Sequence, residues 1–255
     1  MARQPEGPPP PPTVQKLRIR YAKRGRLRFA SHRDLARALE RALRRAQVPM
    51  AFSAGFTPHP KISYVGAAPT GAASEAEYLE IGLAERRDPE QVRAALDASL
   101  PDEIAVLECV EAAEGSGSLA DRMEATTWRI ELPGVEPAAL ERALAAFLAR
   151  DSVEVPRRTK NGLRDIDARA AVTSASTGAE AGCAILKAVV RQVTPAVRPD
   201  DVLAALAAVA DLRPPLPPRA VREAQGRLDD DGTVADPLGP DRAARTRCQG
   251  EHAAV

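Results

Sequence analysis

Residues 32–46 constrain the fold more than any other stretch, because leucine and arginine recur there with the period of an α-helix. Apolar side chains gather on one side of this predicted helix and basic side chains on the other. The two sets are Leu35, Leu39, Ala42, Leu43 and Ala46, and opposite them Arg33, Arg37, Arg41 and Arg44. The chain must therefore supply an apolar surface, which we expect to be a sheet, to bury the leucine side.

The predicted helix has a defined start. Ser31 precedes the periodic run and is a good N-cap, because its hydroxyl oxygen can accept a hydrogen bond from a free backbone N–H. Asp34 lies in the first turn, where a negative charge suits the helix dipole.

The segments around this helix predict strands. Residues 16–21 alternate strictly, with Leu17, Ile19 and Tyr21 on one face and basic residues on the other. Residues 26–29 resume the alternation, either as a bent continuation or as the return of a hairpin. Further strands are expected at 48–56, 62–66, 75–84 and 103–110, a proline-stiffened loop at 57–60, and a helix from Asp88 to about residue 100.

A second series of elements follows the Gly/Ser-rich joint at 114–118. Strands are expected at 126–132 and 184–192, helices at 136–149 and 199–208, and a hairpin of 153–159 with 163–172 that turns at Asn161-Gly162. The predicted fold class is α+β, with two ferredoxin-like β-α-β-β-α-β units in tandem and disordered termini. The boundaries are a proline-rich leader at 1–13, units at 14–113 and 119–212, and a mostly disordered tail at 213–255.

The net charge of +1 conceals a basic segment. Residues 14–64 hold thirteen Lys and Arg against two acidic residues, a net charge of +11. Such a segment is either a solvated face or a surface matched by a polyanion, and the arginine fork suits phosphate oxygens. The candidate phosphate-binding or RNA-binding residues are Arg18, Arg20, Arg28, His32, Arg33, Arg37, Arg41, Arg44, Arg45, His59 and Lys61.

Two of the three histidines, His32 and His59, lie in this basic segment. In a ferredoxin-like unit the β1–α1 and β2–β3 connections share one end of the sheet, so His32 could face His59 and Lys61 and form an anion site. Acid–base cleavage of a phosphodiester by the two histidines is a weaker alternative. The plain alternative is that His32 hydrogen-bonds the capping turn and His59 orders its proline-flanked loop. Two histidines without a third ligand make a poor metal site, so no metal is expected.

Composition excludes several classes. The three cysteines are far apart and form no CxxC pair, which supports neither a disulfide framework nor a zinc cluster, and Cys109 and Cys183 are expected in the core. No apolar run is long enough to cross a membrane and no signal peptide is apparent. We therefore expect a cytoplasmic protein with no membrane association and no cofactor. Most aromatic residues are expected in the core, with Phe56 the best candidate for exposure.

Several motifs resemble a family of prokaryotic proteins of unknown function associated with radical SAM enzymes. They are RYAK at 20–23, LRFASH at 27–32, DL at 34–35, RA at 41–42, RRA at 44–46, SAGFTPHPKIS at 53–63 and EY at 77–78, with TKNG at 159–162 and Asp167 resembling the second half. The resemblance covers about residues 16–210 and implies association with a cobalamin-binding radical SAM protein, without an established activity. The chain lacks the three-cysteine motif that holds the cluster in radical enzymes.

The leading functional hypothesis is a non-catalytic accessory module that binds tRNA or rRNA together with a radical SAM modification enzyme. One alternative is a protein-interaction or substrate-delivery subunit that does not bind nucleic acid. Another is a metal-independent ribonuclease that uses His32 and His59. Whether the protein is an enzyme stays open, with a non-enzyme favoured.

Overall fold

The computed structural model describes residues 10–159 and 162–252, with side chains described as far as Thr246. Most of the predicted leader at 1–13 and the predicted Asn161 turn position lie outside these residues. The chain divides into two compact units. The first comprises the residues up to Thr70, Ala76–Asp121 and those from Pro237 onward, and the second comprises Gly71–Glu75 and Arg122–Asp236.

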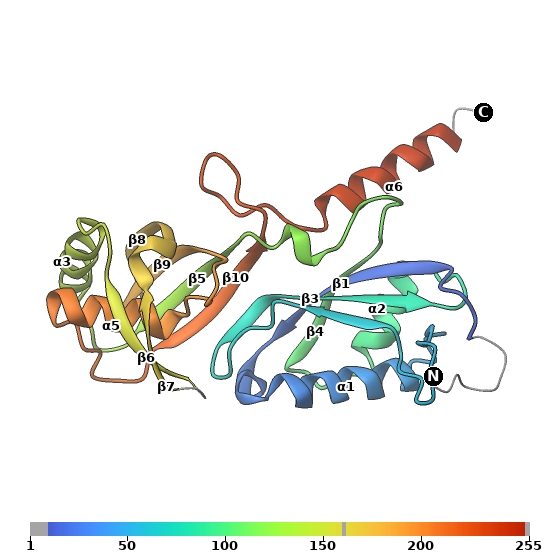
Figure 1. The fold of residues 1–255 in the computed structure, drawn as a ribbon, viewed down its shortest axis with the longest axis horizontal. Helices are drawn as coiled ribbons and strands as arrows, with labels where there is room; N and C mark the ends of the chain where they lie inside the picture. Colours follow the sequence, from blue (N-terminus) through green and yellow to red (C-terminus); the bar gives the residue numbers. More distant parts are fainter. Residues whose placement is uncertain (1–9, 160–161, 253–255) are drawn as a thin grey trace, which may run out of the picture. The chain divides into compact units, whose positions relative to one another are not determined.

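The first unit is a sheet with two helices packed on one face (Figure 1). Its elements are β1 (Gln15–Lys23), the 3-10 helix η1 (Gly25–Phe29), α1 (His32–Arg45), β2 (Ile62–Val65), β3 (Ala73–Leu83), α2 (Pro89–Asp97) and β4 (Ile104–Glu111). The strands are neighbours in the order β4-β1-β3-β2. The alternation predicted for residues 16–21 is confirmed, because Leu17, Ile19 and Tyr21 are all buried against the helices.

The core of the first unit joins α1 to this sheet. Leu35, Leu39 and Leu43 are almost fully buried against the apolar face of β1 and β3, beside Val92 and Leu96 of α2. Burying each such side chain contributes about 1.5–3 kcal/mol. The predicted orientation of the helix, with its leucines inward, is therefore confirmed.

The other face of this sheet carries a buried arginine. Arg18 points away from the core, and its side chain is only 1% exposed. Its guanidinium is 2.8 Å from Asp241 at the start of α6 (Gly239–His252) and 3.0 Å from Glu80 of β3, and it also donates to the carbonyl of Gly117. Burial works to lower the pKa of Arg18, but the hydrogen bonds with Asp241 and Glu80 raise the pKa by more, so the group stays charged.

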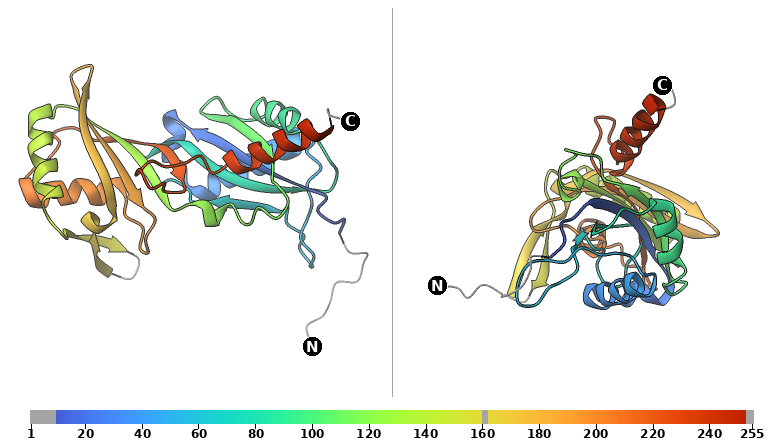
Figure 2. Two further views of the ribbon diagram at one scale, coloured as in Figure 1. Left: turned by 90° about the horizontal axis from the view of Figure 1, so that it is seen from above. Right: turned by 90° about the vertical axis from the view of Figure 1, so that its right-hand side faces the viewer.

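The second unit is likewise a sheet covered by helices. Its elements are η2 (Ala120–Arg122), β5 (Ala125–Leu132), α3 (Pro137–Leu148), β6 (Glu154–Thr159), β7 (Gly162–Asp167), α4 (Ala168–Ala171), β8 (Val172–Glu180), β9 (Cys183–Arg191), α5 (Pro199–Ala210) and β10 (Arg219–Gly226). The strand order is β10-β5-β9-β8, and β10 also pairs in parallel with Ala73 and Ser74 at the start of β3. Helices α3 and α5 lie side by side (Figure 2).

The hairpin of β6 and β7 stands apart from this sheet as a two-stranded ribbon. Val155 and Ile166 are paired across it and buried, and Arg157 is anchored to Asp201 of α5 at 2.8 Å. The predicted hairpin strands are confirmed at this place, although the second strand ends at Asp167 instead of residue 172. Asp167 ends the strand because its carboxylate caps α4 by accepting from the N–H groups of Arg169 and Ala170.

The two units share one order of elements once this ribbon is set aside. Each runs strand, helix, strand, strand, helix, strand, and in each sheet the strands lie in the order last, first, third, second. The expected α+β class is confirmed.

Two predictions in the first unit are wrong. Residues 26–29 form neither a continued strand nor a hairpin return but the 3-10 helix η1. Residues 48–56 are not a strand and make only isolated bridges, Met50 with Leu83 and Phe52 with Pro60. The segment lies beside the end of β3, where Ala51 donates to the Gly82 carbonyl and Ala84 donates to the Pro49 carbonyl, without forming a ladder.

The tail also differs from the prediction of a mostly disordered segment at 213–255, since β10 and α6 form there. β10 lacks an apolar pattern because two of its buried side chains are Arg222 and Gln225, and its place is fixed by an antiparallel ladder with β5. α6 is highly charged, and Asp241 ties it to Arg18 across 223 positions in the chain. Local composition does not reveal either interaction. No described helix combines the length and the hydropathy that a membrane crossing requires.

The buried ion pair gives a stability prediction. Asp241→Ala leaves the Arg18 charge buried with one carboxylate fewer, so we expect a loss of about 3–5 kcal/mol in the free energy of unfolding, measured by urea titration. Arg213→Ala removes an ion pair with Asp211 in which both side chains are about four-fifths exposed, and should cost at most about 1 kcal/mol. Equal effects of the two substitutions would contradict this account.

Cys109 gives a second prediction. Burial raises the pKa of its thiol to about 12, so in the folded protein the thiol stays protonated at pH 8.5, where about half of the unfolded thiols are ionised. Iodoacetamide at that pH should leave Cys109 unmodified while the protein is folded and modify it in guanidinium chloride, as located by mass spectrometry. Half-buried Cys183 is the internal comparison. Native modification of Cys109 at the unfolded rate would refute the prediction.

Candidate nucleic-acid interface

The candidate interface is built on α1, which begins as the sequence predicts. The Ser31 hydroxyl accepts from the Asp34 N–H at 3.2 Å and donates to the Asp34 carboxylate at 2.6 Å. The hydrogen bond from Ser31 holds the pKa of Asp34 below its ordinary value. This reciprocal contact fixes the first turn and, through it, the direction in which the arginines of the helix point.

The arginine row of α1, defined as Arg33, Arg37, Arg41 and Arg44, lies on the solvent side of the helix, and every member is exposed. In the described part of the chain none of the four forms an ion pair. Arg44 Nε donates to the Glu40 carbonyl in its own helix, and the neighbouring Arg45 donates to the Ser99 carbonyl. The row therefore presents cationic side chains that folding has not neutralised.

The structure removes Arg18 from the predicted site. Its guanidinium is buried between two carboxylates, so it serves the fold and cannot reach an external phosphate. Arg20 is half-buried on the same strand. Arg28 is half-buried in η1, where its guanidinium lies 4.5 Å from the centre of the Phe29 ring. Strict alternation in β1 placed Arg18 and Arg20 away from the core, but it could not show that Asp241 at the start of α6 encloses Arg18 there.

His32 is the first residue of α1, and its ring meets the edge of the Tyr64 ring with the centres 5.0 Å apart. Tyr64 lies on β2, and its hydroxyl donates to the Ala36 carbonyl. The His32 ring thus packs on Tyr64 while the residue stays exposed, and in the described residues the capping turn is held by Ser31 and Asp34 instead of by His32.

His59 and Lys61 belong to the 51–61 loop, the segment from Ala51 to Lys61. The Ser53 N–H donates to the His59 carbonyl at 2.8 Å, and the His59 N–H donates to the Ser53 hydroxyl at 3.0 Å. The Lys61 N–H donates to Ala51, and its ammonium group donates to the Thr13 hydroxyl. His59 orders its loop through its backbone, while its side chain stays exposed.

The expected meeting of His32 with His59 does not take place. The 51–61 loop bonds to Gly82 at the end of β3, whereas the end of β1 near the start of α1 contacts Ala68, in the connection before β3. These are opposite ends of the unit, as Figure 1 shows for α1 and the segment that follows it. The prediction depended on residues 26–29 continuing the first strand, and it also took 48–56 as a strand before the loop. Neither strand forms. Without a strand at 48–56 the loop precedes β2, so it lies at the opposite end of the unit.

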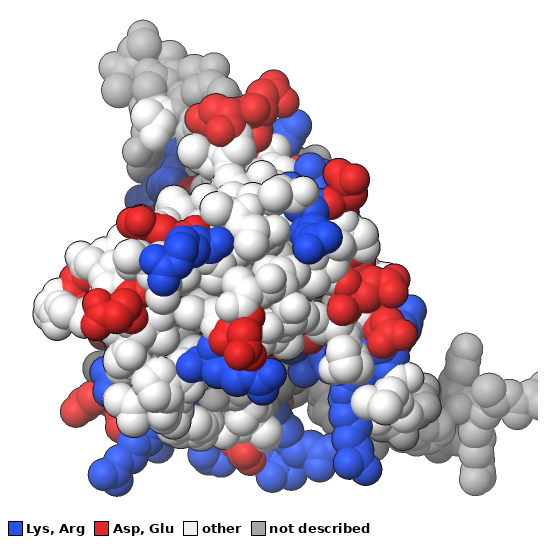
Figure 3. Space-filling model, turned by 90° about the vertical axis from the view of Figure 1, so that its left-hand side faces the viewer, with Lys and Arg blue, Asp and Glu red and all other residues white. Residues whose placement is uncertain are grey.

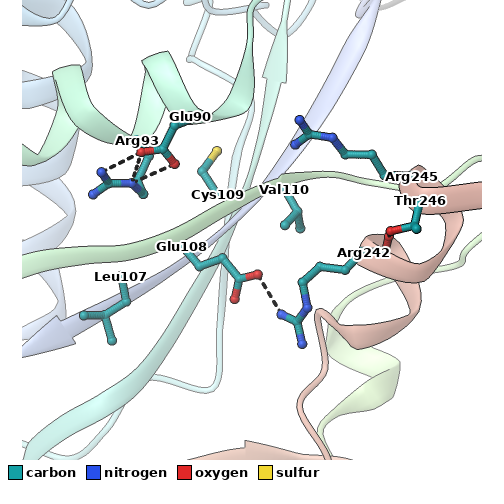
Figure 4. A pocket seen from close by; sticks show the side chains of 9 residues that line it. All are labelled: Glu90, Arg93, Leu107, Glu108, Cys109, Val110, Arg242, Arg245 and Thr246. Atoms are coloured by element: carbon teal, nitrogen blue, oxygen red, sulfur yellow. Dashed lines mark hydrogen bonds and ion pairs between the residues drawn. The ribbon is translucent and has the colours of Figure 1, made fainter. Parts of the chain in front are cut away.

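A second group of arginines was missed by the sequence reasoning. Arg93 of α2 and Arg242 and Arg245 of α6 line a cavity of about 380 Å³ beside β4 (Figure 4). Arg93 is paired with Glu90 and Arg242 with Glu108, so most of the positive charge there is balanced. The sequence reasoning missed this group because two of its arginines lie on α6, in the segment that was predicted to be mostly disordered. Figure 3 shows one face of the molecule, on which basic and acidic side chains are interspersed.

The family match covers most of the chain. Residues 16–199 match the model of a family described as an uncharacterized protein conserved in bacteria, DUF2344. The chain belongs to this family. The expected membership of a family of unknown function is thereby confirmed, whereas its association with radical SAM proteins stays a prediction. No curated protein sequence matches the DUF2344 chain.

Among solved structures, similarity to this DUF2344 protein is weak. An unknown protein from Galdieria sulphuraria has a TM-score of 0.24 at 13% identity, covering 77% of this chain and 92% of that chain. A manganese complex of a DypB variant has a TM-score of 0.23 at 11% identity, covering 78% of this chain and 85% of that chain. The first two RRM domains of yeast poly(U) binding protein have a TM-score of 0.19 at 11% identity, covering 82% of this chain and 98% of that chain. These scores carry no argument about fold or function.

The start of α1 can be tested by Ser31→Ala. Loss of the cap should lower the free energy of unfolding by about 1 kcal/mol, measured by urea titration. Because Asp34 has a lowered pKa, its contribution is present above the unfolded pKa of about 3.9 and is lost as the pH falls through the folded pKa. The difference between variant and wild type should therefore shrink in acid. Ser176→Ala, at an exposed position of β8, should change stability by less than about 0.5 kcal/mol.

Proposed function

We propose that this DUF2344 protein is a non-catalytic RNA-binding module whose contact surface is the arginine row of α1. The observation that supports the proposal is that Arg33, Arg37, Arg41 and Arg44 are exposed on one rigid helix and form no ion pair in the described residues. Clustered positive charges repel one another, so folding alone gives no reason to gather them. A phosphate backbone would balance this repulsion.

The chemistry of the row suits phosphate groups. An arginine guanidinium donates paired hydrogen bonds that match phosphate oxygens, and it stays charged at every physiological pH. Side chains at positions 33, 37, 41 and 44 follow one another by one turn, so they are spaced along the helix axis by about 4.5–6 Å. Regular cations along a line match the repeated charges of a nucleic-acid strand better than a single small anion.

The finer architecture belongs to this proposal. The shared order of elements and of strands supports two ferredoxin-like units, the second of which has its last strand at β10 and carries the β6–β7 ribbon as an insertion. Fold alone does not assign a function to such units.

We further propose that the RNA is a tRNA or rRNA and that the protein serves a cobalamin-binding radical SAM protein as an accessory factor. The sequence motifs at 20–63 support this partnership, and no contact in the structure tests it. Co-purification of that enzyme after nuclease treatment would support the partnership, and loss of the enzyme under the same treatment would count against a direct protein contact.

The RNA proposal is tested by the triple variant Arg37→Glu, Arg41→Glu, Arg44→Glu. Binding of bulk tRNA or rRNA, measured by fluorescence anisotropy over a salt series, should be lost or weakened by at least about 100-fold, because three phosphate contacts become repulsive. In the wild-type protein these three contacts should contribute about 2 to the slope of log affinity against log salt.

A matched control has the same change in net charge. Arg142→Glu, Arg150→Glu, Arg191→Glu reverses three exposed arginines of the second unit that have no ion pair in the described residues. This control should bind RNA nearly as well as the wild type. Equal weakening in the two triple variants would show that only net charge matters, and full RNA binding by the α1 variant would refute the proposal.

A further inference from the structure

Three of the four phenylalanines of the chain are exposed, and all three flank α1. Phe29 is 59% exposed, Phe52 41% and Phe56 69%, whereas Phe147 is fully buried in the second unit. An aromatic side chain offers 150–250 Å² of surface that folding normally buries. Their exposure on both sides of the arginine row points to a ligand with flat apolar groups as well as charges.

Phe29 is held in place immediately before α1. The Ala30 N–H donates to the Leu27 carbonyl at 3.0 Å, which closes η1, and Ser31 then caps the helix. The Arg28 guanidinium lies over the Phe29 ring at 4.5 Å. A flat group that stacks on this ring would also lie beside a positive charge.

Phe56 is presented by the 51–61 loop at the other end of α1. Hydrogen bonds between Ser53 and His59 close this loop, and Pro58 and Pro60 restrict its backbone. Gly55 has φ +138°, a region that side chains rarely adopt, so it shapes the turn before Phe56. A preformed loop loses little entropy when a ligand binds to Phe56.

The two aromatic sites are separated by the length of the helix. α1 has 14 residues and so spans about 21 Å, with the arginine row between η1 at its start and the 51–61 loop beyond its end. Along the helix axis, η1 with Phe29 comes first, then the arginine row, and then the 51–61 loop with Phe56.

We propose that the ligand of this surface is unpaired RNA, a single strand or a loop, whose phosphates lie along the arginine row while bases stack on Phe29 and Phe56. This inference rests on the proposed function. Bases of a duplex are already stacked inside it and cannot reach a protein ring, whereas unpaired bases can turn outward and stack on aromatic side chains. Stacking of this kind tolerates any base, so the surface selects unpaired structure more than sequence.

The test compares oligouridine, which does not pair with itself, with an RNA duplex of equal length, using fluorescence anisotropy at fixed salt. Wild type should prefer oligouridine. Phe29→Ala and Phe56→Ala should each weaken oligouridine binding by roughly 5- to 150-fold, the range found for loss of one base–aromatic stack, and should leave duplex binding unchanged. Leu163→Ala, at a 77% exposed apolar residue of the β6–β7 ribbon, should change neither.

A conservative variant adds a positive readout. Phe56→Trp should retain oligouridine binding, and its indole fluorescence should be quenched when a base stacks on it. Trp128, the one native tryptophan, is buried and should contribute a constant signal.

The outcomes separate the two proposals. If the α1 triple variant loses RNA but both phenylalanine variants bind oligouridine like wild type, the inference of stacking is wrong and the RNA-binding function stands. If wild type binds neither RNA, the proposed function fails. If the phenylalanine variants keep RNA but lose a co-purifying protein, these rings dock a protein and the inference is overturned.

Discussion

The buried guanidinium of Arg18 is the interaction on which the first unit most depends. A charge that is 1% exposed is tolerable only with full compensation, which Asp241 and Glu80 supply together with the Gly117 carbonyl. These partners come from the start of α6, from β3 and from the segment after β4, so one side chain joins three distant parts of the chain. This network lies on one face of the sheet, and α1 and α2 pack on the other.

The location of the candidate interface follows from that division. Arg18 is enclosed on one face of the sheet, whereas α1 buries its leucines against the other face and holds the arginine row in solvent. The same helix thus stabilises the core and displays the arginine row. A substitution on its solvent side should alter binding without altering the core, which makes charge reversal there a fair test of function.

How much was predictable differs from residue to residue. The cap at Ser31, the burial of Leu35 and Leu39 and the exposure of Arg37 follow from local chemistry and the helical period, and the structure agrees. The predicted approach of His32 to His59 is wrong, because it required a continued strand at 26–29 and a strand at 48–56, and neither forms. Without the second strand the loop lies at the other end of the unit. The exposure of Phe56 was expected, but that of Phe29 and Phe52 was not, since apolar residues in alternating runs usually face a core.

The sequence by itself determined the α+β class, both faces of α1 and the concentration of positive charge in residues 14–64, because each depends on periodicity or composition within a short stretch. Only the tertiary structure decided which of those charges are free. The local pattern places both Arg18 and Arg37 on the side of their element that faces away from the core. Arg18 is nevertheless enclosed by Asp241 from the far end of the chain, whereas Arg37 faces solvent. Likewise β10 and α6 are held by a ladder and an ion pair over long sequence separations, and such pairings leave no local pattern to recognise.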